Sequence, residues 1–92
     1  MPPFAAKGFQ HLQVGKRYVV VEAFEDYDRY IHPVGECWTF LGHDIFGKED
    51  GLSLYLSRDD RVAWHVRLQW IPQEQGAIID NLERYVRPTS VG

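Results

Sequence analysis

Two neighbouring runs of alternating apolar and polar residues restrict the fold of this chain more than any other feature. Residues 52–57 (LSLYLS) and 62–70 (VAWHVRLQW) each carry an apolar side chain at every second position. Successive side chains of a β-strand point to opposite faces, so each run predicts a strand with one buried face. The polar residues 58–61 (RDDR) between them predict a hairpin connection. The predicted inward side chains are Leu52, Leu54, Leu56, Val62, Trp64, Val66, Leu68 and Trp70.

Two further strands are expected nearer the N-terminus. Residues 17–24 (RYVVVEAF) are rich in β-branched and aromatic side chains, which favours a strand that is covered at least partly on both faces. A second strand is expected over residues 36–41 (ECWTFL), with Trp38 and Phe40 on one face. Gly42 is expected to end this strand or to bend it.

The spacing of apolar residues changes after Pro72 to three and four positions, which is typical of a helix with one apolar stripe. We expect this helix over residues 73–86, lying across an open end of a barrel. Pro88 limits its continuation. Gly76, near its start, lowers the local helix propensity by about 1 kcal/mol relative to alanine.

These elements predict a single mainly β domain. The length of 92 residues suffices for one hydrophobic core and is too short for two. We expect a loosely ordered lead-in over residues 1–13, one domain over residues 14–88, and a tail over residues 89–92. The pattern favours a small SH3-like barrel closed by one C-terminal α-helix. A strongly bent antiparallel sheet packed on that helix is the alternative, because periodicity does not reveal strand order.

Cysteine content and the absence of long apolar stretches bear on the compartment. Cys37 is the single cysteine, which excludes an internal disulfide and any multi-cysteine zinc or iron–sulfur site. No segment approaches the roughly 20 apolar residues that span a bilayer, and the first ten residues do not resemble a secretory signal. A cytoplasmic location is therefore expected, with no membrane partner.

The charge distribution constrains the partner. The net charge is −3, and residues 22–50 carry eight acidic side chains against two basic ones. Such a segment disfavours nonspecific nucleic-acid binding, which depends on Lys and Arg displacing counterions from phosphates. It suits a basic protein partner, although solvated acidic surface explains the same pattern.

Residues 15–85 resemble a bacterial family of domains of unknown function that carries a Phe-Leu-Gly motif, here Phe40-Leu41-Gly42. The supporting segments are GKRYVVVEAFEDYD, HPVGECWTFLG, DGLSLYL and VRLQW. The resemblance implies a compact domain and no particular activity, and it assigns no catalytic residue.

Candidate reaction sites are weak in this sequence. Its four histidines lie in different segments, without the local spacing of zinc sites, so we predict neither a metal nor a cofactor. A small metal-dependent or histidine-based hydrolase is the alternative, and it requires His43, His65 and Asp44 to converge in space. Cys37 lacks a nucleophile signature and is interpreted as a packed residue.

The hypothesis we favour is a non-catalytic module that binds a protein partner. Tyrosine supplies contact area at low entropic cost, while carboxylates orient basic groups. Inhibition of the partner, as by an immunity protein, is one form of this function. A structural role through homodimer formation is a third possibility. The proposed partner-binding residues are Glu25, Asp26, Tyr27, Asp28 and Tyr30.

Overall fold

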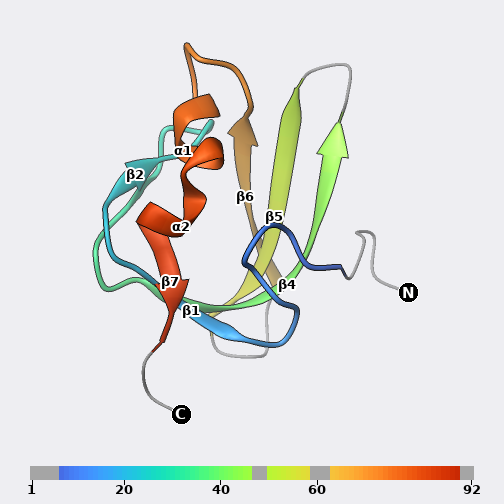
Figure 1. Cartoon of the computed structure of the whole chain (residues 1–92), viewed down its shortest axis with the longest axis vertical. Coiled ribbons are helices and arrows are strands. Elements are labelled where there is room, and N and C mark those ends of the chain that lie inside the picture. Colours follow the sequence, from blue (N-terminus) through green and yellow to red (C-terminus); the bar gives the residue numbers. More distant parts are fainter. Residues whose placement is uncertain (1–6, 47–49, 59–62, 90–92) are drawn as a thin grey trace.

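The computed structural model describes residues 7–46, 50–58 and 63–89, and it is dominated by one antiparallel sheet (Figure 1). The sheet has five strands in the order β6-β5-β4-β1-β7. The mainly β class predicted from the sequence is therefore confirmed. The strands are β1 (Arg17–Val20), β4 (Cys37–Phe46), β5 (Gly51–Ser57), β6 (Ala63–Gln69) and β7 (Val86–Pro88).

The sheet does not close into the barrel that the sequence favoured. Within the described residues its edge strands, β6 and β7, do not pair with each other. Two short helices contact these edges instead, α1 (Gly76–Asp80) at β6 and α2 (Leu82–Tyr85) at β7. The sheet is thus bent and open. In a closed barrel its two edge strands would be hydrogen-bonded to each other, whereas here each edge strand is contacted by a helix.

A separate hairpin lies beside the sheet and pairs β2 (Phe24–Glu25) with β3 (Ile31–His32) (Figure 1). The residues that the sequence placed in one strand over 17–24 are therefore divided between β1 and β2. The hairpin reaches the edge of β6 through its turn, where the backbone N–H of Tyr27 donates to the carbonyl oxygen of Arg67 at 2.8 Å. This bond brings the turn alongside the outer face of the sheet.

A β-bulge lies in the middle of β4. Phe40 pairs with Leu56, but Gly42 pairs with Tyr55, so Leu41 is an extra residue on this strand. A bulge bends its strand and increases the local twist. Gly42 therefore does not end the strand, which continues to Phe46 in a shifted register.

Alternation of the side chains is as predicted in β6 but only partly so in β5, where Ser53 and Ser57 of the polar face are buried as well. The leucines of β5 are buried, and so are Val66 and Leu68 of β6. Trp64 is half-buried against the core, whereas Trp70 lies beyond the end of β6 and remains 38% exposed. Residue 62 lies outside the described residues. The core consists of Phe9, Leu12, Tyr18, Val20, Phe24, Trp38, Phe40, Leu52, Leu54, Leu56, Val66, Leu68, Ile79, Leu82 and Val86.

The single helix predicted over residues 73–86 is wrong in its length and continuity. It is replaced by α1 and α2, which are separated at Asn81. The side chain of Asn81 donates to the carbonyl oxygen of Ala77 at 2.8 Å, in competition with backbone helix formation. Val86 leaves the helix and pairs with Val20, which adds β7 to the sheet. Pro88, without an N–H, is tolerated because β7 is an edge strand.

The N-terminal segment differs from the loosely ordered lead-in expected over residues 1–13. Residues 1–6 lie outside the described residues, but Phe9 and Leu12 are buried in the core. The side chain of Gln10 donates to the carbonyl oxygen of Ile79 at 2.9 Å. The described part of the segment is thus packed against α1.

The two helices of the described residues are both too short to span a bilayer.

We expect Gly76→Ala to lower the free energy of unfolding by about 1–3 kcal/mol, the usual cost of overpacking a filled site. A Cβ at this position would lie 2.6 Å from the carbonyl oxygen and 2.7 Å from the carbonyl carbon of Ile71. Urea unfolding would measure the change. A loss of stability would point to the close approach of Ile71, because glycine-to-alanine changes in helices ordinarily raise the free energy of unfolding. An increase in stability would contradict this close approach.

Candidate functional site

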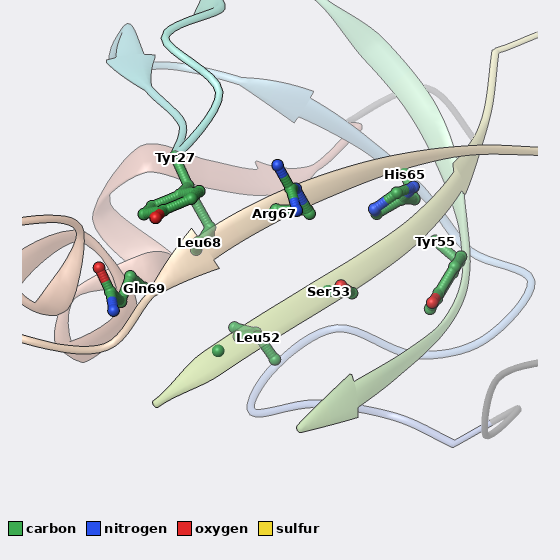
Figure 2. A pocket seen from close by; sticks show the side chains of 9 residues that line it. Tyr27, Leu52, Ser53, Tyr55, His65, Arg67, Leu68 and Gln69 are labelled. Carbon is green, nitrogen blue, oxygen red and sulfur yellow. The ribbon is translucent and has the colours of Figure 1, made fainter. Parts of the chain in front are cut away.

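A groove of about 610 Å³ runs along the outer face of β5 and β6 (Figure 2). Its floor and walls come from these two strands, and Tyr27 of the hairpin turn closes one side. The residues that line it are Tyr27, Gly51, Leu52, Ser53, Tyr55, His65, Arg67, Leu68 and Gln69.

Strand register explains why polar and aromatic side chains gather in this groove. Inward positions of both strands are taken by apolar core residues, so the intervening positions project from the opposite face. Ser53 lies opposite Arg67, and Tyr55 lies opposite His65, in the antiparallel pairing of β5 with β6. Directly opposed residues on one face are close enough to interact.

Tyr55 and His65 form an aromatic pair at one end of the groove. Their ring centroids are 5.4 Å apart and the planes are inclined by 28°. The hydroxyl of Tyr55 donates to Oδ2 of Asp44 at 3.4 Å. Burial, together with the charge of Asp44, raises the pKa of Tyr55 above its ordinary value of 10.0. The phenol therefore remains protonated at neutral pH.

Arg67 is fixed in the middle of the groove by Asp28. Nε of Arg67 donates to Oδ2 of Asp28 at 2.9 Å, and Nη2 donates to Oδ1. The guanidinium carbon also lies 5.5 Å from the ring centroid of Tyr27. The hydrogen bond from Arg67 lowers the pKa of Asp28 below 3.8, and the same bond raises the pKa of Arg67. Nη1 of Arg67 has no hydrogen-bond partner among the described residues.

The turn that carries Tyr27 and Asp28 is organised by the buried side chain of Asp26. Oδ1 of Asp26 accepts the backbone N–H groups of Asp28 at 2.9 Å and Tyr30 at 3.0 Å. Its other oxygen, Oδ2, lies 2.8 Å from Nε2 of His32. One carboxylate thus ties the turn to the strand that follows it.

His32 is itself held between two carboxylates. While Nε2 contacts Asp26, Nδ1 lies 2.8 Å from Oε1 of Glu36, and the histidine is only 1% exposed. A neutral imidazole carries one N–H, so both contacts are hydrogen bonds only when the ring or a carboxyl holds an additional proton. Phe24 stacks on the ring at a centroid distance of 4.8 Å, and Trp64 packs against it at 5.4 Å.

The structure separates the five residues that the sequence proposed for partner binding. Tyr27 lines the groove, and Tyr30 is 70% exposed on the same hairpin. Asp26 is buried, at 3% exposure. Asp28 is paired with Arg67, and Glu25 forms a 3.3 Å ion pair with an arginine four residues later. The carboxylates of this segment therefore already have partners within the molecule.

The residues of the alternative hydrolase site do not converge. Asp44 and His65 both contact Tyr55 on the outer face of the sheet. His43 packs instead on Phe9, at a centroid distance of 5.0 Å, and its Nδ1 lies 3.1 Å from the carbonyl oxygen of Lys7. Cys37 donates its thiol to the carbonyl oxygen of Gly35. Within residues 7–46, 50–58 and 63–89, no three His, Cys, Asp or Glu side chains are placed to hold a metal ion.

Sequence reasoning missed most of the groove. The alternation over residues 52–57 and 62–70 predicts only that Ser53, Tyr55, His65 and Arg67 lie on the polar faces of two strands, and it does not predict that they line one groove. The available signal was the kind of residue at these outward positions, because tyrosine, histidine and arginine together are more typical of a contact surface than of plain solvated strand.

Residues 5–88 match a family described as "Domain of unknown function (DUF3601)". A solved structure of an integron cassette protein from the mobile metagenome of Vibrio cholerae is similar to this chain, with a TM-score of 0.86 and 28% sequence identity. The similarity covers 90% of this chain and 91% of that protein. No curated protein matches the sequence.

We expect Asp26→Ala to lower the free energy of unfolding by about 3 kcal/mol or more, because it removes one partner of a buried, hydrogen-bonded pair. The change leaves His32 and two backbone N–H groups without their acceptor. Glu25→Ala is the matched control, and its exposed ion pair predicts a change within about 0.5 kcal/mol. Urea unfolding measures both variants. Equal losses would argue against the structural importance of Asp26.

We expect Asp28→Asn to flatten the acid limb of the stability profile. Since the pKa of Asp28 is lowered by Arg67, its contribution is fully present above 3.8 and is lost as the pH falls through the folded-state value. Unfolding measured from pH 5 to pH 2 should therefore show a shallower decline in the variant. Arg67→Gln removes the other partner of the same ion pair and should reproduce the shallower decline. Profiles parallel to the wild type in both variants would disprove the coupling.

Proposed function

We propose that this chain, which belongs to the DUF3601 family, is a non-catalytic binding module that acts by occupying the surface of a protein partner. The observation that carries the proposal is the groove on β5 and β6, in which Tyr27, Tyr55, His65 and Arg67 are held by neighbouring side chains. A volume of about 610 Å³ is ample for side chains of a partner segment.

The kinds of residue in the groove support binding. Tyrosine and arginine are enriched among the residues that contribute most to protein interfaces. Arg67 is bonded to Asp28, and Tyr55 is stacked on His65, so these side chains lose little conformational freedom when a partner arrives. Tyr27 remains 42% exposed and offers an aromatic surface at the side of the groove.

The centre of the proposed interface is thus the groove on β5 and β6, and not the acidic residues 25–28. Of the residues proposed from the sequence, Tyr27 occupies the groove, while Tyr30 is the most exposed aromatic side chain of the same hairpin. Inhibition of the partner remains one form of the proposed function. A cytoplasmic location suits the unpaired thiol of Cys37, which is partly exposed.

The test is quantitative capture of partners from cell lysate on the wild-type protein and on Tyr27→Ala and Tyr55→Ala variants. Loss of a large aromatic anchor should weaken a genuine partner's binding at least about tenfold. Glu83→Gln is the control, because Glu83 lies in a separate polar depression beside α2 and should leave capture unchanged. Circular dichroism and urea unfolding confirm that each variant is folded.

The proposal is contradicted if every protein captured by the wild type is retained equally by both tyrosine variants. It is contradicted as well if Glu83→Gln causes the same losses as the two groove variants.

A further inference from the structure

We propose that the groove recognises an acidic side chain of an extended partner segment, whose carboxylate pairs with the outer edge of the Arg67 guanidinium beside an aromatic or aliphatic side chain. This inference rests on the proposed function and specifies the chemistry of the partner. It reverses the expectation of a basic partner that the acidic sequence segment suggested.

The geometry of Arg67 is the first argument. A guanidinium presents its N–H groups along more than one edge, and each edge can meet a carboxylate in a two-bond arrangement. Asp28 uses the edge formed by Nε and Nη2. The edge formed by Nη1 and the second hydrogen of Nη2 meets no acceptor among the residues that the structure describes, and the side chain is 50% exposed. Asp28 therefore orients Arg67 without using all of its donors.

The charge balance of the groove is the second argument. The carboxylates next to it already receive donors, since Arg67 donates to Asp28 and Tyr55 donates to Asp44. Burial and the neighbouring Asp44 raise the pKa of Tyr55, and the hydrogen bond to Asp28 raises the pKa of Arg67, so both shifts favour the protonated forms that donate hydrogen bonds. A lysine or arginine of a partner would therefore approach the charged Arg67 and would find Asp28 and Asp44 already accepting hydrogen bonds, which disfavours its binding. An acidic side chain would meet Arg67 directly.

The arrangement of the aromatic rings is the third argument. Figure 2 shows Arg67 and His65 in a row along β6, with Tyr27 toward one end and Tyr55 toward the other. A carboxylate bound at Arg67 would therefore have aromatic surface on either side of it. The lining residues extend along β5 and β6 on both sides of Arg67, so a partner segment can make contacts on either side of the bound carboxylate. This favours an internal acidic residue over a chain terminus.

Blocked dipeptides test the inference without any mutation. N-acetylated and C-amidated phenylalanyl-glutamate is titrated into the ¹⁵N-labelled wild-type protein and compared with the phenylalanyl-glutamine and phenylalanyl-lysine analogues. We expect saturable shifts at the amides of Ser53, His65 and Arg67 with the glutamate peptide. Loss of the charge should weaken binding about tenfold, as expected for a charge-assisted bidentate pair. The lysine peptide should bind no better than the glutamine peptide.

Variants then assign the contact. Arg67→Gln should abolish the preference for glutamate over glutamine, and Arg67→Lys should restore only part of it, because lysine lacks the planar fork. Arg84→Gln is the control, since Arg84 lies in the separate depression beside α2. N-acetylphenylalanine, whose charge is a terminal carboxylate, should bind more weakly than the glutamate dipeptide.

Several results would overturn the inference. These are equal affinities for the glutamate and glutamine peptides, stronger binding of the lysine peptide, shifts confined to residues outside the groove, or stronger binding of the terminal carboxylate. Failure of the proposed function is distinguishable from failure of this inference. A captured partner that is lost in Tyr27→Ala and Tyr55→Ala but retained fully by Arg67→Gln would leave the groove as the interface and remove acid recognition.

Discussion

The arrangement of this molecule depends on one buried imidazole that lies between two carboxylates. Both ring nitrogens of His32 are 2.8 Å from a carboxylate oxygen, in surroundings that exclude water. Removing such groups from water is costly unless every polar atom is paired, so the three side chains constrain one another. Because Asp26 also accepts two backbone N–H groups, the same cluster determines the conformation of the hairpin turn.

The groove follows from this constraint together with the faces of the sheet. The hairpin turn delivers Tyr27 to the edge of β6 and Asp28 to Arg67. The sheet contributes Tyr55, His65 and Arg67 because apolar residues occupy the alternate positions of β5 and β6. The β2–β3 hairpin therefore makes the outer face of β5 and β6 concave, and the resulting groove is lined by aromatic and polar side chains.

The charge of the molecule illustrates why composition alone does not show which acidic side chains are free to meet a partner. The acidic segment suggested a basic partner, yet three of its carboxylates, at residues 25, 26 and 28, are paired with Arg29, His32 and Arg67. These pairs join residues that are four, six and thirty-nine positions apart in the chain. A count of charges treats every charged side chain as free in solvent. In the folded protein, these carboxylates are paired with basic side chains, so a partner does not meet them as free charges.

The sequence by itself determined the mainly β class and the buried faces of β5 and β6, because alternation is a local property of a strand. Tertiary structure decided the rest. The predicted helix is interrupted at Asn81, whose side chain bonds to Ala77, and it ends where Val86 pairs with Val20 of β1. The open sheet and the groove likewise arise from contacts between distant segments. Local patterns record which side chains are buried, but not which of them meet.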